Sequence, residues 1–543
     1  MMKTQIGPNV VKGFLKAKGT AVVNGAGEDI ILKGWGIGNW LLCEGYMWLS
    51  GGGKRFDRPR NIETVIRELT GSKYAEGFWK RFRENYTTET DIRYMAELGY
   101  NSVRLPINWR LIMEDEPGII WKEDGFRLID QFLGWCEKWD IYAFLDLHGA
   151  PGGQTGHNID DSVDDFPRLF TDKDSWDKGI AIWRELARRY KDCEIVGGYD
   201  LLNEPLRPGL IDGKNLDYLL PRLARFYDEA IAEIRKLDTK HMISLEGHHW
   251  STNTAVFHKK YDDNVIIHFH RYACMPGIES LKPYLEARTK FNAPLWLGET
   301  GENVLEWYAA MYPLNVALGI GYNLWTWKKM DCNNSPCSVK KPDGWDKIIS
   351  YTQGGPRPSY EEAQTILDQY LENMKLENCV KNEAVNKHVF RYPGCRVRGT
   401  DFDLLPGKGV SFSGLRSEGN VYGYQTETGM AIVAISDEPM DKRFFFDCGW
   451  DGLTLEMELN EYAAYTFERI EAGCKLKLEL SSSKDALITV CQDASEIKEL
   501  RPADSLGYQE ILIDKLIPSE SSRFKVFVKG GKIKLDAISL LSK

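Results

Sequence analysis

Residues 197–205 read GGYDLLNEP, an apolar run that stops abruptly at Pro205. Such a run indicates a buried strand whose last residues stand at the rim of a sheet, and here those residues are Asn203 and Glu204. In a parallel α/β sheet or barrel, chemistry is placed at the carboxyl ends of the strands, because the strands hold side chains rigidly there. Glu204 is therefore a candidate catalytic acid. The alternative is that Asn203 and Glu204 merely cap the next helix.

A second stretch, residues 293–300 (APLWLGET), repeats this design and ends in Glu299. The stretch of chain between Glu204 and Glu299 is long enough for about two further βα units. Two rim glutamates can flank one bond. Carboxyl groups held about 5 Å apart, one protonated and one ionised, are what retaining hydrolysis of a glycosidic bond requires.

The remaining apolar runs predict an α/β fold, a (β/α)8 TIM barrel, because about eight strand–helix units fit into about 350 residues. We expect a small hairpin within residues 10–29 to plug the bottom of this barrel. Besides the two rim stretches, strands are predicted over residues 30–41, 101–107, 141–149, 242–250, 264–272 and 321–327. Helices are predicted over residues 125–139, 175–190, 216–237 and 359–374, and Gly99 is predicted to cap an earlier helix.

The hydrophobic pattern of the sequence changes beyond residue 376, where short apolar or alternating runs follow one another. Such spacing predicts an all-β sandwich, jelly-roll-like, without catalytic residues. We expect two domains, a catalytic barrel over residues 1–380 and a sandwich over residues 385–543. The predicted strands of the sandwich lie at residues 444–446, 453–457, 476–480, 487–490, 524–528 and 533–538.

Composition excludes several classes of function. The net charge of −10 and the pI near 5.6 argue against a nucleic-acid partner. No signal-peptide pattern and no long apolar span are apparent, so we expect a cytoplasmic protein without a membrane span, or a secreted one if a signal had been removed. The 11 cysteines are scattered without CxxC pairs, and although Cys332 and Cys337 bracket a loop, disulfides are not expected.

Four of the nine histidines lie close together in predicted rim segments: His248, His249, His268 and His270. A zinc site is one interpretation. No carboxylate or cysteine of fixed spacing accompanies these histidines, however. We therefore expect no metal and no organic cofactor, since side chains alone can supply acid, base and electrostatic stabilisation.

At this point a family resemblance is plain, because a set of residues on successive strands resembles glycoside hydrolase family 5, over residues 30–375. The set is Arg104, His148, Asn203, Glu204, His270, Tyr272, Glu299 and Trp325. Residues 38–41 (GNWL), Glu44 and residues 146–154 (DLHGAPGGQ) resemble the exo-β-1,3-glucanase branch, although residues 328–331 (KKMD) depart from its usual Lys-Thr-Glu. The C-terminal part faintly resembles carbohydrate-binding modules of families 6 and 35. The alternative is a sandwich that only buttresses the barrel.

The resemblance implies roles for these residues. Glu204 would be the acid/base and Glu299 the nucleophile, with Arg104 and Tyr272 donating to Glu299. His270 would lie near Glu204, and Asn203 would hydrogen-bond the sugar 2-hydroxyl. Trp325 would lie beneath the sugar, or else be core. Further candidates for the pocket and its aromatic wall are Glu44, Tyr46, Trp48, His148, Asn158 and Trp327.

We therefore expect a retaining glycoside hydrolase that acts on a carbohydrate substrate, a β-glucan oligosaccharide or β-glucoside. The expected type is an exo-acting β-glucosidase or exo-β-1,3-glucanase. The first alternative is an endo-acting β-1,4-glucanase or mannanase of the same family. The remote alternative is a catalytically inactive, sugar-binding barrel.

Overall fold

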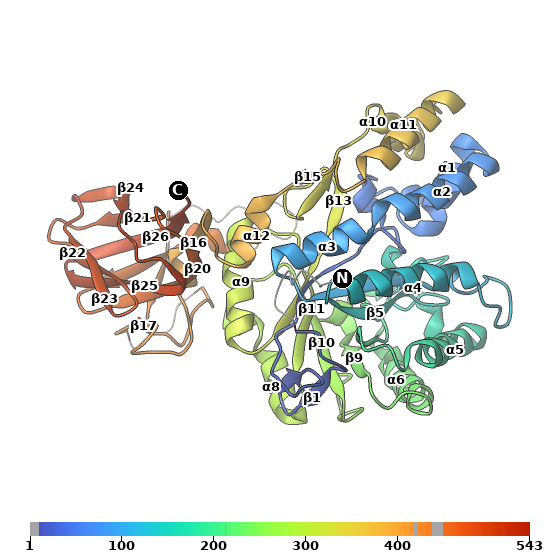
Figure 1. Cartoon of the computed structure of the whole chain (residues 1–543), viewed down its shortest axis with the longest axis horizontal. Helices are drawn as coiled ribbons and strands as arrows, with labels where there is room; N and C mark the ends of the chain where they lie inside the picture. The colour runs from blue at the N-terminus through green and yellow to red at the C-terminus, as the bar shows by residue number, and fades with distance from the viewer. Residues whose placement is uncertain (1–9, 212, 417–421, 437–448) are drawn as a thin grey trace. The chain divides into compact units, whose positions relative to one another are not determined.

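A computed structural model describes residues 10–211, 213–416, 422–436 and 449–543. The chain divides into two compact units (Figure 1), and each takes up several segments of the sequence. The first unit holds residues 1–271, 284–301 and 320–381, and the second holds residues 272–283, 302–319 and 382–543. Among the described helices, none is both long and apolar enough to cross a membrane.

The first unit is a closed barrel of eight parallel strands, in the order β10-β11-β12-β3-β4-β5-β6-β9. The predicted barrel is thus confirmed. Buried on both faces, such strands are apolar almost throughout, which explains the uninterrupted runs in the sequence. The strands are β3 (Lys33–Gly36), β4 (Ser102–Asn108), β5 (Tyr142–Gly149), β6 (Val196–Asp200), β9 (Met242–Glu246), β10 (Val265–Arg271), β11 (Leu295–Gly301) and β12 (Gly321–Trp325).

The first barrel strand along the chain, β3, is shorter than the predicted strand over residues 30–41. Beyond Gly36 the backbone leaves the ladder, because the N–H of Gly38 donates to the Thr326 hydroxyl at 3.0 Å instead of to a neighbouring strand. The residues that follow therefore form the rim and its loops. A short 3-10 turn, η1 (Gly45–Trp48), begins directly after Glu44.

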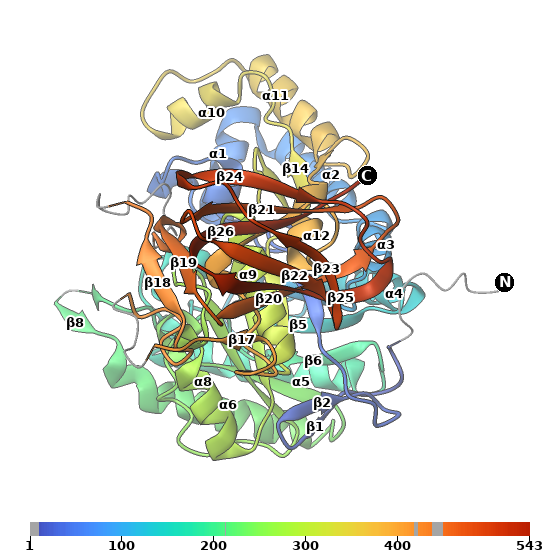
Figure 2. The same ribbon diagram turned by 90° about the vertical axis from the view of Figure 1, so that its left-hand side faces the viewer.

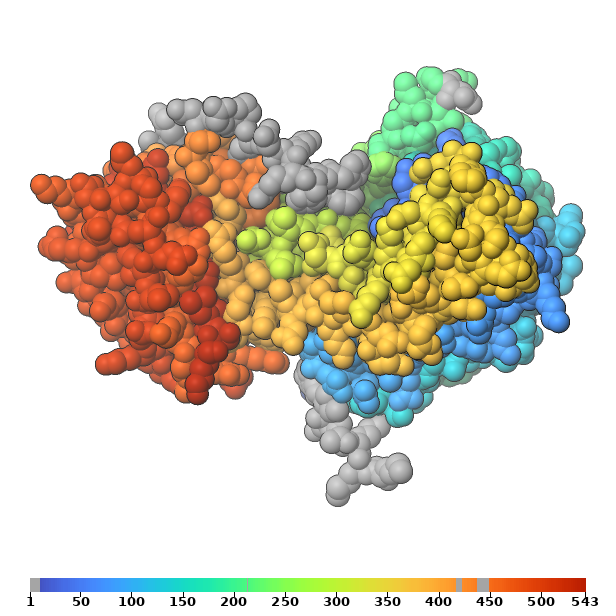
Figure 3. Space-filling model, turned by 90° about the horizontal axis from the view of Figure 1, so that it is seen from above, coloured from blue at the N-terminus to red at the C-terminus, as the bar shows by residue number. Residues whose placement is uncertain are grey.

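Helices surround the strands, and local sequence signals fix their ends. Helix α3 (Glu89–Leu98) begins with a capping box of Thr88 and Asp91 and ends, as predicted, at left-handed Gly99. Helices α10 (Trp345–Thr352) and α11 (Tyr360–Asn373), yellow in Figure 3, lie near the blue surface of the early helices, where α11 contacts α1 and α2. The other α-helices in the sequence up to β11 are α1 (Pro59–Thr70), α2 (Ser72–Tyr86), α4 (Glu123–Lys138), α5 (Lys173–Tyr190), α6 (Leu220–Arg235), the short α7 (His248–Ser251) and α8 (Lys282–Phe291).

The N-terminal hairpin pairs β1 (Lys16–Lys18) with β2 (Ala21–Val23). Leu15 and Val22 pack in one apolar cluster with residues at or near the amino-terminal ends of barrel strands, among them Tyr142, Met242 and Ile266. The hairpin therefore covers the end of the barrel opposite the rim, as predicted.

The C-terminal part of the second unit is an antiparallel sandwich, as predicted (Figure 2). Leu478 of one sheet and Tyr465 of the other belong to the same buried core. One sheet contains β18 (Ala431–Ala434), β19 (Leu453–Glu458), β26 (Lys532–Leu541), β21 (Lys475–Ser482) and β24 (Ser505–Ile513), with β16 (Cys395–Arg398) on β26. The other contains β17 (Phe412–Ser413), β20 (Tyr462–Ile470), β25 (Ser519–Gly530), β22 (Leu487–Gln492) and β23 (Ser495–Leu500). The predicted strand at residues 444–446 lies outside the described residues, and sugar binding by the sandwich stays a prediction.

Helix α9 (Leu305–Ala317), which follows β11 in the sequence, belongs to this second unit. Ala309 is part of the sandwich core, and its carbonyl accepts a hydrogen bond from Arg391 Nε at 2.7 Å. Helix α12 (Glu383–Val389) packs on α9. The order of elements along the chain does not predict this assignment. The ten cysteines that the structure describes, Cys332 and Cys337 included, are all free thiols.

Candidate active site

The register of β10 and β11 sets the direction of Glu299. Phe269 pairs with Leu297 and His270 pairs with Glu299, so Gly298 is an extra residue in β11. A bulge of this kind turns the next side chain and commonly occurs beside active sites. A Cβ atom on Gly298 would lie 2.0 Å from His268 Nε2, so only glycine fits there. The bulge places Glu299 beside His270 at the rim.

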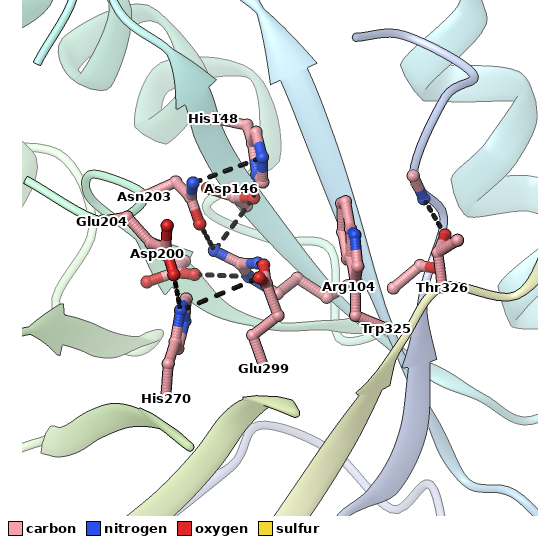
Figure 4. A network of polar contacts seen from close by, with 12 residues as sticks. Arg104, Asp146, His148, Asp200, Asn203, Glu204, His270, Glu299, Trp325 and Thr326 are labelled. Carbon is pink, nitrogen blue, oxygen red and sulfur yellow. Dashed lines mark hydrogen bonds and ion pairs between the residues drawn. The ribbon is translucent and has the colours of Figure 1, made fainter. Parts of the chain in front are cut away.

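Arg104 on β4 joins the acidic residues of the barrel mouth (Figure 4). The guanidinium is completely buried, and its Nη1 donates to Glu299 Oε2 at 2.6 Å. Burial alone would lower the pKa of Arg104, but four surrounding carboxylates outweigh it and raise that pKa well above its ordinary value. Its other partners are Asp146 Oδ2 at 3.0 Å, Asp200 Oδ2 at 2.8 Å, Glu246 Oε1 at 2.9 Å and Asn203 Oδ1 at 2.8 Å. Arg104 is thus positioned to stabilise negative charge on Glu299.

Glu204, four residues beyond β6, has a left-handed backbone with φ of 44°. Its main-chain N–H donates to Glu246 Oε2 at 2.7 Å, and its side chain meets His270 Nδ1 at 2.8 Å. His270 Nδ1 also lies 3.8 Å from Glu299 Oε1. One oxygen of Glu204, one oxygen of Glu299 and a nitrogen of His270 lie within 4.8 Å of one another. The two rim glutamates therefore share one imidazole.

Burial raises the pKa of Glu204 above its ordinary value, against the lowering influence of His270. Burial would lower the pKa of His270, but Glu246, Glu299 and Glu204 together raise it well above its ordinary value. The imidazole is thus charged near neutral pH and donates to Glu204. A carboxyl group with a raised pKa can serve as a proton donor.

His148 orients Asn203. Burial, followed by the charge of Arg104, lowers the pKa of His148 to about 3, so its ring is neutral. With Asp146 Oδ2 at 2.7 Å from Nδ1, that nitrogen carries the hydrogen, and Nε2 accepts from Asn203 Nδ2 at 3.2 Å. Because Arg104 donates to Asn203 Oδ1, both ends of the Asn203 amide are fixed. One N–H of this amide has no further partner among these contacts and is available to a substrate.

Trp325 lies at the end of β12, where its ring stacks on His148 at a centroid distance of 5.2 Å and an interplanar angle of 3°. Its indole nitrogen donates to the Tyr46 hydroxyl at 2.8 Å. Tyr46 is 43% exposed. Buried Glu44 has Oε1 at 3.9 Å from His148 Nε2. The structure thus brings these four predicted pocket residues together.

Other predicted pocket residues lie elsewhere. Trp327 is buried in the core against Trp35, and its indole donates to Asp91 at 3.0 Å. The strand alternation that would place it beside Trp325 does not apply, because β12 ends at Trp325. Trp48 is also a core residue, fully buried and hydrogen-bonded to Asn39. The predictions for Trp48 and Trp327 are wrong.

Two further predicted residues are Asn158, which lies in a loop, and Tyr272, which follows β10. The Asn158 amide donates to the main-chain oxygen of Asp57 at 3.2 Å and so holds a loop. Tyr272 is half-buried directly after β10. Its donation to Glu299 stays a prediction.

Sequence reasoning missed three buried site residues, Asp146, Asp200 and Glu246, and named His268 only as one of the clustered histidines. His268 Nε2 lies 3.0 Å from His270 Nε2, and His268 Nδ1 lies 3.1 Å from Asp200 Oδ1. Burial raises the pKa of Glu246, while His268 and Arg104 overcome burial and lower that of Asp200. These residues could have been found in the sequence as charged residues inside apolar strands, but this criterion was met with a functional interpretation only for Arg104.

Three groups of histidine and acidic side chains in the described part of the chain have converging ligand atoms. Two of them share His270: Glu246 with His268 and His270, and Glu204 with His270 and Glu299. Both belong to the network around Arg104, in which Arg104 donates to Glu246 and Glu299, and His270 lies 2.8 Å from Glu204.

Residues 61–331 match the model of the cellulase family, glycosyl hydrolase family 5. The chain is 31% identical over 279 residues to a β-xylosidase of Phanerodontia chrysosporium, covering 51% of this chain and 56% of that protein. It is 27% identical over 308 residues to endoglucanase C of Acetivibrio thermocellus, covering 47% and 88%. It is 30% identical over 223 residues to a glucan 1,3-β-glucosidase of Candida oleophila, covering 38% and 48%.

The matched part of this chain spans about half the length of the β-xylosidase and of the glucan 1,3-β-glucosidase. A crystal structure of endogalactoceramidase aligns with 97% of this chain and 100% of its own, with a TM-score of 0.50 and 16% identity. That likeness concerns the fold alone. Together with the barrel and its two rim glutamates, the match over residues 61–331 assigns the chain to glycoside hydrolase family 5.

Proposed function

We propose that the protein hydrolyses β-glycosidic bonds with retention of configuration, with Glu299 as nucleophile and Glu204 as acid/base. The observation that carries this proposal is the placement of His270 between the two glutamates. Oxygens of Glu204 and Glu299 lie within 4.8 Å of one another. Carboxyl groups about 5–5.5 Å apart suit double displacement, whereas about 6.5–9.5 Å leaves room for the water of an inverting enzyme.

In the first step, Glu299 attacks the anomeric carbon while Glu204 protonates the departing glycosidic oxygen. This forms a glycosyl–enzyme ester and releases the aglycone. In the second step, Glu204, now ionised, takes a proton from water, whose oxygen displaces Glu299 from the same carbon. Arg104 stabilises the ionised Glu299 at the start and end of the cycle. The Asn203 amide donates to the sugar 2-hydroxyl, a contact that strengthens as charge develops.

For the substrate, we propose a β-glucoside or short β-glucan from which single glucose units are removed. Support comes from Glu44, Tyr46, Trp325 and His148, which lie together at one side of the site. A glucan 1,3-β-glucosidase and a β-xylosidase are among the relatives. An endo-acting glucanase is the second candidate, because endoglucanase C is matched over 88% of its length.

The test follows the anomeric configuration of the product. Hydrolysis of an aryl β-glucoside, recorded by proton NMR during the first minutes, should release the β-anomer of glucose before mutarotation. Release of the α-anomer would overturn the proposal. Absence of turnover on aryl β-glucosides, β-xylosides, cello-, laminari- and manno-oligosaccharides would instead favour an inactive sugar-binding barrel.

A further inference from the structure

A third group of convergent ligand atoms lies outside the network of Arg104. It consists of Asp217, His248 and His249, whose ligand atoms lie within 4.8 Å of one another. Asp217 begins the short turn η6 (Asp217–Leu219), and the histidines follow β9. Sequence reasoning set a zinc site aside because no carboxylate accompanies these histidines at a fixed spacing. The fold supplies one from 31 residues upstream (248 − 217 = 31).

The distances suit a tetrahedral ion. Asp217 Oδ1 lies 2.7 Å from His249 Nε2 and 3.9 Å from His248 Nε2. Two ligands each about 2.0–2.1 Å from a tetrahedral zinc ion are about 3.3 Å apart, and the two observed distances lie on either side of this value. We propose that Asp217, His248 and His249 bind one zinc ion at the rim of the barrel.

The surroundings of each ligand fit this role. Asn215 Nδ2 donates to Asp217 Oδ2 at 2.9 Å, which orients the carboxylate and leaves Oδ1 toward the histidines. The His248 side chain is only 3% exposed, so its ring is held in place by the surrounding protein. Asp217 is 44% exposed and His249 24% exposed, so water can reach the fourth position.

The backbone at the histidines is strained. His249, Trp250 and Ser251 have consecutive φ values of 54°, 56° and 56°. Residues other than glycine rarely adopt this left-handed conformation, so the surrounding structure must hold these three in place. The hydrogen bond from His249 N–H to the Leu206 carbonyl, at 2.9 Å, is one such restraint. The strained turn points the two imidazoles toward Asp217.

An ion here would join two loops that flank the acid/base. Asp217 follows the hairpin of β7 (Leu210–Ile211) and β8 (Lys214–Asn215), which projects from the barrel in Figure 2. This segment begins just after Glu204. The zinc ion would hold the segment to the loop after β9, as a stabilising clip with no part in bond cleavage.

The experiment uses the full chain without an affinity tag, dialysed against EDTA and then against buffer. Titration with zinc chloride, followed by calorimetry, should give one tight site per chain, and saturating zinc should raise Tm. Asp217→Asn and His249→Gln should each weaken zinc binding at least tenfold and abolish the rise in Tm. His258→Gln, at an exposed histidine of the same unit, should behave like the wild type. Magnesium should bind none of these proteins, because imidazole is a poor ligand for it.

Several outcomes would overturn the proposal. Zinc binding that is undiminished in Asp217→Asn and His249→Gln would place the ion elsewhere, at cysteines or at the catalytic glutamates, and Glu204→Gln identifies the latter case. Absence of zinc binding by the wild type would also overturn it. Circular dichroism without zinc checks that each variant is folded. The outcome does not depend on the proposed hydrolysis, because Glu299→Gln should bind zinc as the wild type does.

Discussion

The main-chain N–H of Glu204 donates to Glu246 Oε2 at 2.7 Å. Glu204 has a φ of 44°, a backbone conformation that is unfavourable for every residue except glycine. Glu246 also accepts from Arg104 at 2.9 Å, so one buried carboxylate fixes both the acid/base and the arginine beside the nucleophile. Glu246 is therefore a positioning residue. It acts through Glu204 and Arg104.

Replacing Glu246 tests this role. Glu246→Gln keeps an oxygen acceptor and should lower kcat about tenfold, whereas Glu246→Met should lower it about 100-fold, the cost of a displacement near 1 Å. KM should change little. Because Glu204 is displaced, the loss should be larger for alkyl glucosides, which need protonation, than for dinitrophenyl glucosides. An equal loss for both substrates would show that Glu246 is merely structural.

Glu204→Gln should separate the two halves of the mechanism. For an alkyl glucoside, kcat/KM should fall by about 10²–10⁴-fold, the usual contribution of a general acid. For a dinitrophenyl glucoside, which leaves without protonation, kcat/KM should fall much less. Glu299→Gln should abolish turnover of both. A similar loss for both aglycones in Glu204→Gln would reject Glu204 as the acid.

The pH dependence has a defined sign. Glu204 must be protonated in the first step, so kcat/KM falls as the pH rises through its pKa. Burial raises that pKa and His270 opposes the rise. His270→Asn removes the opposing charge and should move the alkaline limb of kcat/KM to higher pH, whatever its effect on the maximum. The measurement is a pH profile of both proteins, and a shift toward lower pH would contradict the assignment.

Exo-action can be read from a time course. Incubated with laminari- and cello-oligosaccharides, the protein should release glucose as the only early product, because the group around Glu44 and Tyr46 would close the site beyond the first sugar. Chromatography of samples from the first minutes tests this. Oligomers of intermediate length in those samples would indicate an open groove and endo-action.

The sequence predicted the parts of the site that depend on strand ends. Glu204, Glu299 and Arg104 belong to clear apolar runs, and a parallel barrel brings the ends of such runs together. Trp325 and Trp327 could not be separated in this way, because the two-residue period holds only while the strand lasts. In the sequence, Asp146 and Glu246 do not differ from ordinary members of their strands.

Contacts between loops were beyond sequence reasoning for a different reason. Asp217 meets His249 only because the hairpin after Glu204 folds toward the loop after β9. No periodicity in the sequence encodes such an approach. The same holds for Asn158, whose side-chain amide donates to the main-chain carbonyl of Asp57.

Removal of residues 382–543 should destabilise what remains. Helix α9 has buried aromatic side chains, among them Trp307 and Tyr308, and Ala309 belongs to the sandwich core. Loss of the sandwich exposes the apolar surface around Ala309 to water, at a cost of about 25 cal/mol per Å², and removes Arg391 from the Ala309 carbonyl. We expect a lower Tm and aggregation of the truncated protein in thermal scans. An unchanged Tm would instead indicate a tethered, independent module.

The assignment of residues 272–283 and 302–319 to the second unit also bears on how this gene can change during evolution. A module encoded by one continuous stretch of DNA can be gained or lost in a single recombination event. Here α9 is encoded between two strands of the barrel, so exchange of the terminal stretch alone would leave α9 facing a foreign core. Substitutions in α9 are therefore expected to be accompanied by matching substitutions in the sandwich.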